Sequence, residues 1–395
     1  MVEIRPFRAI RYNQKKIKIE DVISQPYDKI TPEMQNQYYE KSPYNYVRVI
    51  LGRSEDRYRE AVKNLWDWFN RGILIKEDEE SIYPYNQEFV IDGEKKVRKG
   101  FICVFKLAEY DEGVVLRHEL TLSKPKEDRM KLMKSIKKDS ECIFVLHNSE
   151  VDLDYENEIA SCKDYLDVTH RMWKMSDKDK IEKIKNGLLN DRLLIADGHH
   201  RYETSLRYRN EVGKEYGYKK PSDYIMAAFV NINDPGLVIL PTHRLLYNLD
   251  TTNISKMEEY FEIEKLGECT EPKKHELVLY TGNFYLLKLR DEALLDDPAH
   301  SRDYNFLDVN MLHKLIIRNV FGIKDVEEHV LYERNREEGM KKVEEGKAQL
   351  LFILHPTTIE EVKRISQNGE MMPQKSTDFY PKMISGLTAF DLEEW

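Results

Sequence analysis

The fold of this chain is decided by the stretch Leu193-Leu194-Ile195-Ala196-Asp197-Gly198-His199-His200-Arg201-Tyr202-Glu203-Thr204. Four apolar residues end in Asp-Gly, and a polar, charged run with helical character follows them. The pattern predicts a buried strand, a tight turn, and the first turn of a helix. Gly198 suits such a turn because glycine adopts backbone conformations that other residues avoid.

The predicted helix start offers a site for an anion. Its first backbone N–H groups have no acceptor within the helix, and the positive end of the helix dipole lies there. Arg201 adds a guanidinium, which can hold a phosphate through two hydrogen bonds. We therefore expect Gly198, Arg201 and Thr204 to bind a phosphate or a nucleotide.

Titratable side chains gather at the same turn, and the predicted catalytic residues there are Asp197, His199, His200 and Glu203. Asp197 could instead serve only as a helix N-cap. His199 and His200 point about 100° apart on a helix and do not share a metal ion, whereas His199 and Glu203 lie on one face. The chain has neither His-Glu-x-x-His nor paired cysteines, so no structural zinc is expected and no metal ligand is assigned.

The bulk properties exclude several classes of protein. A length of 395 residues predicts two or three domains, and a net charge of −9 argues against a constitutive nucleic-acid binder. The four cysteines are widely spaced, which favours reduced thiols in a cytoplasmic protein. No apolar run is long enough to cross a membrane, and the first residues contain no signal-peptide core. A homo-oligomer is compatible with all of this.

Helical and strand-like patterns alternate along the chain, which predicts a mixed α/β protein of the α+β class. We expect an N-terminal region over residues 1–248 and a C-terminal α/β lobe over residues 249–395. The run Tyr46–Leu51 predicts a strand, and Asp92-Gly93 predicts a hairpin turn. Residues 254–262 have the pattern of a helix.

Two residues near the N-terminus are further candidates. Asp28 follows Pro26-Tyr27 and is either a turn residue or a general base that accepts a proton from a substrate hydroxyl. Arg48 lies inside the predicted strand at 46–51. A charge in an apolar strand needs a partner, so Arg48 forms either a structural ion pair or an anion ligand.

Binding groups are also predicted where strands meet loops. His118, Glu119 and Lys124 lie at one such boundary and could contact the nucleotide or a substrate carboxylate. We expect Lys126 and Lys131 to belong to a solvated helix face. Thr242, His243 and Arg244 form a second polar cluster at a predicted strand end, where substrate sites often occur. Lys375 lies in a predicted loop over residues 371–377. Each of these segments could also be an ordinary connection.

The motif Asp197–Thr204 resembles the signature of a prokaryotic domain-of-unknown-function family, numbered ten-fifteen. Other matching segments extend over nearly the whole chain: Gln25–Asp28, Thr31–Glu33, Ser42–Asn45, Thr121–Arg129, Leu240–Arg244 and Met372–Thr377. The Asp-Gly-His-His-Arg turn is also similar to the phosphate-binding turn of the ParB/sulfiredoxin superfamily, including its free-serine kinases. These resemblances imply a ParB/sulfiredoxin-like catalytic core with additional α/β lobes.

The resemblance also implies nucleotide-dependent transfer of a phosphoryl group to a small hydroxyl compound, with free L-serine first. ATP or ADP would be the donor, and Mg²⁺ would be held through the nucleotide phosphates. A nucleotide-binding switch or ParB-like regulator is the alternative, and a metal-dependent nuclease or hydrolase is the third. Neither a P-loop motif nor G-x-G-x-x-G occurs, so any nucleotide must use a different cradle.

Overall fold

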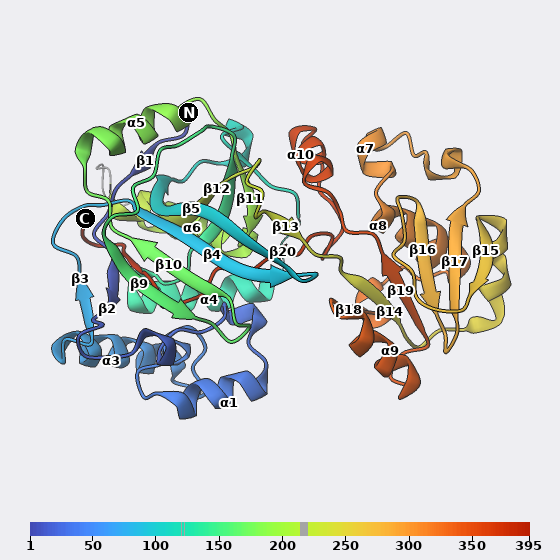
Figure 1. The fold of residues 1–395 in the computed structure, drawn as a ribbon, viewed down its shortest axis with the longest axis horizontal. Coiled ribbons are helices and arrows are strands. Elements are labelled where there is room, and N and C mark those ends of the chain that lie inside the picture. Colours follow the sequence, from blue (N-terminus) through green and yellow to red (C-terminus); the bar gives the residue numbers. More distant parts are fainter. Residues whose placement is uncertain (120, 122, 214–219) are drawn as a thin grey trace. The chain divides into compact units, whose positions relative to one another are not determined.

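The computed structural model describes residues 1–119, 121, 123–213 and 220–395, without the side chains of residues 123–125, 251 and 327 (Figure 1). The Cα packing divides the chain into two compact units. Unit 1 comprises Met1–Arg117, Thr121–Leu237 and Pro381–Trp395, and unit 2 comprises His118–Leu120 and Val238–Tyr380. The expected mixed α/β fold is confirmed, because both units combine helices with β-sheets.

Unit 1 is built on a nine-stranded sheet with the order β6-β11-β8-β12-β5-β4-β10-β9, in which β1 also pairs with β5. The β11–β6 and β12–β8 pairs are parallel and the other pairs are antiparallel. The strands are β1 (Ile4–Arg5), β4 (Tyr83–Ile91), β5 (Glu94–Lys106), β6 (Val115–Leu116), β8 (Ile143–His147), β9 (Glu158–Lys163), β10 (Thr169–Trp173), β11 (Leu193–Asp197) and β12 (Tyr224–Asn231).

The predicted hairpin turn at Asp92-Gly93 joins β4 to β5. Both residues have positive φ, 51° and 77°, which is the conformation of the two-residue turn that matches the twist of a hairpin. The prediction is therefore confirmed, and the hairpin gives the sheet its longest ladder.

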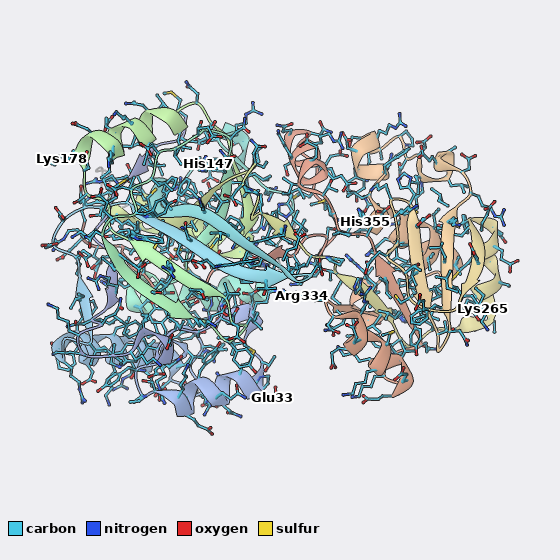
Figure 2. The ribbon with its side chains drawn as sticks, in the orientation of Figure 1. Glu33, His147, Lys178, Lys265, Arg334 and His355 are labelled. Atoms are coloured by element: carbon cyan, nitrogen blue, oxygen red, sulfur yellow. The ribbon has the colours of Figure 1, made fainter. Side chains whose placement is uncertain are left out.

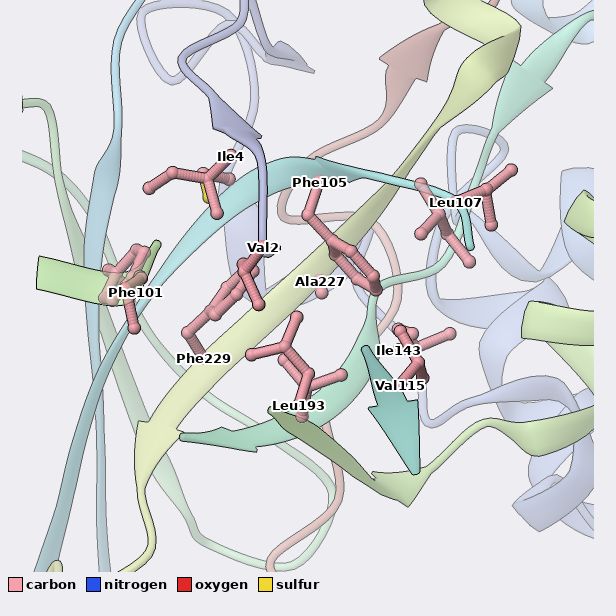
Figure 3. Packing of buried hydrophobic residues seen from close by; sticks show 14 of the residues in the cluster. Val2, Ile4, Phe101, Phe105, Leu107, Val115, Ile143, Leu193, Ala227 and Phe229 are labelled. Carbon is pink, nitrogen blue, oxygen red and sulfur yellow. The ribbon is translucent and has the colours of Figure 1, made fainter. Parts of the chain in front are cut away.

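The core of unit 1 lies between this sheet and its helices (Figure 3). The rings of Phe101 and Phe229 stack with centroids 4.9 Å apart, and Phe105 meets Phe229 edge-on. Helix α5 (Lys178–Leu188) contributes Ile181, Ile184 and Leu188 to this cluster, and α6 (His199–Gly213) contributes Tyr202 and Leu206. The helix after the central turn is thus anchored by its apolar face.

Smaller elements complete unit 1, and the prediction of a strand at Tyr46–Leu51 is wrong. Val47–Ile50 forms a short helix, α2, in which three aliphatic side chains are buried. A short apolar run is compatible with a strand or a buried helical turn, and here tertiary packing selects the helix. The remaining elements are β2 (Ile10–Tyr12), η1 (Ile19–Asp21), η2 (Tyr27–Lys29), α1 (Pro32–Lys41), α3 (Arg57–Asn70), β3 (Leu74–Lys76), η3 (Tyr110–Glu112), α4 (Ser123–Ile136), β7 (Lys138–Asp139), η4 (Pro221–Asp223) and β21 (Phe390–Asp391).

Unit 2 contains a six-stranded antiparallel sheet with the order β15-β17-β16-β19-β14-β18. Its strands are β14 (His243–Leu246), β15 (Phe261–Leu266), β16 (Glu276–Tyr280), β17 (Phe284–Leu289), β18 (Val330–Glu333) and β19 (Leu350–Leu354), and β13 (Val238–Ile239) pairs with β20 (Phe379–Tyr380). The helices are η5 (Thr251–Glu259), η6 (Glu292–Leu295), α7 (Arg302–Asn305), α8 (Asp308–Met311), η7 (Leu312–Val320), η8 (Val326–Glu328), α9 (Arg336–Glu344) and α10 (Ile359–Gln367).

Two features of unit 2 differ from the sequence-based expectation. The helix expected over residues 254–262 is a 3₁₀ helix, η5, and Phe261 already belongs to β15. Thr242, His243 and Arg244 do follow a short strand, β13, as expected, but His243 and Arg244 also begin β14, which pairs with both β18 and β19.

The main boundaries between the two compact units lie at residues 237–238 and 380–381, and not at the expected residue 248. Residues 238–248 pack with unit 2 because β14 lies inside its sheet. Residues 381–395 return to unit 1, where β21 pairs with β7 and Ala389 bridges Ile10.

Candidate functional site

The central turn has the geometry that its sequence predicts. Strand β11 ends at Asp197, Gly198 has φ +97°, and α6 begins at His199. A Cβ atom at Gly198 would lie 2.8 Å from Cγ2 of Ile143 and 3.1 Å from Cζ of Arg201. Glycine is therefore required both by its backbone angle and by the two side chains packed against it.

The pairing between β11 and β8 shifts between Ile195 and Asp197. Such a bulge re-aims the side chain that follows it. Here Ala196 is skipped in the pairing, and Asp197 pairs with Phe144 immediately before the helix start.

The carboxylate of Asp197 is held by two cations. Its Oδ2 atom lies 2.8 Å from Nη2 of Arg201, and its Oδ1 atom lies 2.9 Å from Nζ of Lys382. Burial alone would raise the pKa of Asp197, but Lys382, Arg201 and then Lys29 outweigh burial and hold that pKa far below its usual range. Asp197 is therefore ionised at neutral pH.

Arg201 is buried and fixed on two sides, since it also donates to the carbonyl oxygen of Cys142. Burial disfavours its charge, but Asp197, Glu141 and Asp28 favour it, so the pKa of Arg201 is raised. The guanidinium is consequently a permanent positive charge at the start of α6.

A second group of side chains surrounds Arg201, and sequence reasoning missed it. Glu141 accepts hydrogen bonds from the Tyr27 N–H group (3.1 Å), the Ser385 hydroxyl (2.8 Å) and Arg129 (3.4 Å). The Arg129 guanidinium lies over the Tyr27 ring, 4.0 Å from its centroid. These contacts bring the N-terminal motif at residues 25–28 to the central turn.

A small cavity of about 20 Å³ lies between Arg129, Asp139, Glu141, Arg201 and Thr204. A buried water needs roughly 10–15 Å³ on this measure, so the cavity has room for about one water and not for a nucleotide. The cavity is therefore too small to be the substrate site.

The other predicted residues of the helix differ in accessibility. His199 is buried, whereas His200 is half-buried. The hydroxyl of Thr204 is buried and donates to the carbonyl oxygen of His200 at 2.7 Å, a bond within the helix. Of these three side chains, His200 is the one that a bound molecule can reach.

Glu203 lies in a separate ion-pair cluster. Its carboxylate accepts from Lys126 (2.9 Å), Thr121 (2.6 Å) and Arg117 (3.4 Å). Burial opposes ionisation, but Lys126 and Thr121 outweigh it, so the pKa of Glu203 is lowered. The prediction that Lys126 belongs to a solvated helix face is therefore wrong.

Three further predicted residues lie in different surroundings. Asp28 is exposed on η2, and its charge acts on Arg201. Arg48 donates to the carbonyl oxygens of Tyr39 (2.7 Å) and Ser42 (3.3 Å), and its guanidinium lies over the Tyr39 ring, so it fastens the end of α1. The side chain of Lys124 lies outside the described residues.

The six predicted substrate-binding residues all belong to unit 2, where they surround the segment 372–377. Arg244 donates to the carbonyl oxygens of Thr242 and Lys375, and Glu119 accepts from the Lys375 N–H group at 3.2 Å. His118 lies 2.9 Å from the Thr377 hydroxyl. The structure thus brings these residues together, but their polar atoms are mostly used in hydrogen bonds with one another.

Two of these residues are deeply buried bases. Burial, followed by the charge of Arg244, lowers the pKa of His243 to about 4, and Nδ1 of His243 accepts from the Leu354 N–H group at 3.3 Å. Burial also lowers the pKa of Arg244 to about 10. His243 thus ties β14 to β19, whereas Arg244 ties it to the loop that contains Lys375.

The described side chains do not form a ready-made metal centre. No group of three His, Cys, Asp or Glu within the described residues could hold an ion. Both oxygens of Asp197 and both oxygens of Glu203 already accept from cations or a hydroxyl. Mg²⁺ needs free oxygen ligands, so these carboxylates do not suit it as they stand.

Within the described part of the chain, no helix combines the length and the apolar character needed to span a bilayer.

Comparison with known proteins gives one strong match. The family model described as "Protein of unknown function (DUF1015)" matches residues 4–310. No curated protein matches the chain.

Several solved structures are similar at low level. A conserved hypothetical protein from Pyrococcus furiosus is 13% identical with a TM-score of 0.36, and the match covers 71% of this chain and 92% of that one. A mutant free serine kinase in complex with ADP is 12% identical with a TM-score of 0.39, covering 71% and 89%. SbnI from Staphylococcus aureus, truncated at its C-terminus, is 10% identical with a TM-score of 0.36, covering 74% and 86%. At these values nothing about the activity of this chain follows from the likeness.

Proposed function

The chain belongs to the DUF1015 family of proteins of unknown function, and from that premise we propose that it is a nucleotide-dependent phosphotransferase acting on a small hydroxyl compound, with free L-serine first. The observation that supports this most is the turn at Gly198, where a helix start, a permanently charged guanidinium and a lysine ammonium converge. Phosphoryl transfer depends mainly on positioning and on stabilising negative charge, and this turn supplies both.

The transferring phosphate would lie at the start of α6. Backbone N–H groups in the first turn have no acceptor within the helix, and they point toward such an anion. Arg201 would contribute its charge, and its two bonds to Asp197 and Cys142 keep that charge in place. His200, which is half-buried, would bond to a phosphate oxygen or orient the acceptor.

Asp197 acts in this proposal as a positioning residue. Its carboxylate joins Arg201 to Lys382, and its lowered pKa makes it a poor proton acceptor. Glu203 is unsuitable as a base for the same reason, since Lys126 and Arg117 hold it ionised.

Asp28 is the base that we propose. It is exposed on η2, and its charge reaches Arg201, so a substrate hydroxyl near the transferring phosphate could approach it. A general base needs correct placement more than an unusual pKa, and an exposed carboxylate can accept the proton as the phosphate bond forms.

The donor would be ATP or ADP, and Mg²⁺ would arrive with it and neutralise the phosphate charges. Serine is the first acceptor to test because the Asp-Gly-His-His-Arg turn resembles that of the free-serine kinases. Among the residues considered for substrate binding, those of unit 2 are engaged with one another and have no part in this step.

The test is an assay of the purified full chain with Mg²⁺, ATP or ADP, and a panel of hydroxyl compounds headed by L-serine. Mass spectrometry would detect the phosphorylated product. Arg201→Ala should abolish it, whereas Arg207→Ala should not. Arg207 is the matched control because it lies on the same helix and also pairs with a carboxylate, Glu211, at 3.0 Å, but at an exposed position.

Two results would contradict the proposal. Product formation that survives in Arg201→Ala would show that the turn does not hold the phosphate. Slow nucleotide hydrolysis without any phosphorylated acceptor would favour the nucleotide-binding switch instead.

A further inference from the structure

Unit 2 contains a polar cavity of about 140 Å³ that the proposed function does not use. Its walls come from the loop after η6, from α7 and α8, and from η7. A single water needs roughly 10–15 Å³ on the same measure, so the space is about ten times larger than one water requires. It is large enough for a small metabolite.

The helix that lines this cavity is unusual. Residues Leu312–Val320 form a π-helix, and the Phe321 N–H group donates to the Ile316 carbonyl oxygen, five residues earlier. Such segments are rare, and they occur frequently at functional sites. This one places His313, Lys314 and Arg318 along the cavity wall.

His313 presents an unused polar atom. Its Nε2 atom is buried and has no hydrogen-bond partner among the described residues. Burial, followed by the charges of Arg244 and Arg318, lowers the pKa of His313 to about 3, so the ring is neutral. A buried polar atom without a partner costs about 1–3 kcal/mol, and proteins usually satisfy such atoms with a water or a ligand.

Positive charge faces the cavity from the same helix. The Lys314 ammonium is fixed by the carbonyl oxygens of Leu295 and Asp296, both at 2.9 Å. The Arg318 guanidinium is exposed and has no hydrogen-bond or ion-pair partner among the described residues. An unpaired guanidinium beside a fixed ammonium is suited to a carboxylate.

Negative charge faces the same space. Asp297 lines the cavity, and its Oδ1 atom accepts from the Ala299 N–H group at 3.0 Å. Burial is the main cause that raises the pKa of Tyr304, another wall residue. The charge of Glu370 and, to a smaller extent, that of Asp297 add to that rise, whereas the charge of Arg318 acts against it. The Tyr304 side chain, in the cavity wall, therefore lies near both positive and negative charge.

We propose that this cavity binds a small zwitterion, a free amino acid, whose carboxylate contacts Arg318 and Lys314 and whose ammonium contacts Asp297. His313 bonds to a polar atom of the same ligand. A simple anion would leave the Asp297 carboxylate without an opposite charge, and a simple amine would leave the Arg318 guanidinium without one. This inference goes beyond the proposed phosphotransferase and does not depend on it, because every residue used here belongs to unit 2.

The test is isothermal titration of the full chain, without nucleotide, using glycine and L-serine. Acetate, ethylamine and inorganic phosphate are the comparison ligands. We expect the amino acids to bind, and we expect Arg318→Ala and Asp297→Asn each to weaken that binding about 10- to 100-fold, the loss of one charge-assisted hydrogen bond. Lys265→Ala is the control because Lys265 is an exposed cation of the same unit, on β15 (Figure 2).

His313→Leu is a second variant, chosen because it removes a buried polar atom without a partner and should not impair folding. It should weaken binding and leave thermal stability equal or higher.

His200→Ala, in unit 1, separates the two proposals. If His200→Ala abolished amino-acid binding while Arg318→Ala left it intact, the ligand would lie at the turn and the inference would be wrong. Binding of acetate or phosphate as tight as that of the amino acids would also overturn it. A chain that binds amino acids through Arg318 yet phosphorylates nothing would keep this inference and reject only the phosphotransferase.

Discussion

The ammonium of Lys382 lies 2.9 Å from Oδ1 of Asp197, although 185 residues separate them in the sequence. The contact is within unit 1, because residues 381–395 return there after unit 2 is complete. Lys382 is buried, and it completes the charge balance of the central turn together with Arg201.

Replacing Lys382 with methionine should destabilise unit 1. Removing one partner of a buried pair commonly costs about 3–5 kcal/mol, and we expect about 2–3 kcal/mol because Arg201 remains. The four tryptophans, Trp66, Trp68, Trp173 and Trp395, all lie in unit 1, so urea unfolding followed by tryptophan fluorescence reports this unit. Lys137→Met, which breaks an exposed pair with Glu393, is the control and should cost less than about 1 kcal/mol.

The same variant should show a defined pH dependence. The pKa of Asp197 is lowered in the folded protein, so its ion pairs stabilise the fold above the ordinary aspartate pKa of about 4 and lose that effect as the pH falls. The unfolded chains of the natural protein and Lys382→Met titrate alike, so the difference in stability between them should shrink once the pH falls below the Asp197 pKa of the folded variant, which Arg201 still lowers. A difference that stays constant over the whole acidic range in which both proteins fold would mean that the pair contributes through packing alone.

Gly198→Ala should impair both folding and activity. The residue would have to adopt φ +97° and would place its Cβ 2.8 Å from Ile143. Gly93→Ala is the matched control, since Gly93 has φ +77° but nothing within 4 Å of a Cβ. We expect the strain alone to cost about 1–2 kcal/mol in both variants, with a larger loss at Gly198. Equal losses of unfolding free energy in the two variants would refute the role given to close packing.

Asp139→Asn should stabilise unit 1 at neutral and alkaline pH. Burial raises the pKa of Asp139 to about 7, although its carboxylate accepts from the Met226 N–H group at 2.8 Å. An acid with a raised pKa lowers stability as the pH increases from about 4 to 7, because ionisation is easier in the unfolded chain. Asparagine removes that cost and can keep the bond.

We expect a gain of about 2–4 kcal/mol at pH 8 for Asp139→Asn that falls toward zero at pH 4. Urea unfolding at several pH values measures it. Asp139→Ala should instead lose stability at pH 4, because the Met226 N–H group loses its acceptor, and this loss should shrink as the pH rises because alanine also removes the cost of ionisation. A gain that does not depend on pH would contradict the explanation.

Asp28→Asn should slow phosphoryl transfer about 10²–10⁴-fold if Asp28 is the base. Its exposure means that the free energy of unfolding should not change measurably. Steady-state kinetics should show the loss in kcat with KM little altered. Asp56→Asn is the control, since Asp56 is also exposed and its side chain makes no capping bond to α3. An undiminished kcat in Asp28→Asn would assign the base to another group.

Some of this structure could be predicted from local sequence. The strand, turn and helix at residues 193–204 follow from an apolar run, a glycine and a polar helix start, and the structure confirms all three. The hairpin at Asp92-Gly93 has an equally local signal. Neither depends on a residue that is distant in the chain.

Other features could not be predicted because they depend on tertiary packing. The run at 46–51 is β-branched and apolar, yet it forms α2, since burial of three side chains outweighs strand propensity. Lys382 and Glu141 carry no motif of their own, and only the folded chain brings them to Asp197 and Arg201. Lys126 lies on a charged helix whose sequence does not reveal its partner, Glu203.

The return of residues 381–395 to unit 1 has a consequence for biosynthesis. A ribosome makes Asp197 and Arg201 early and reaches Lys382 only after it has translated residues 238–380. A nascent chain, or a product of premature termination within that stretch, therefore carries the aspartate without its ammonium. The ion pairs of Asp197 are therefore complete only after residues 238–380 have been translated.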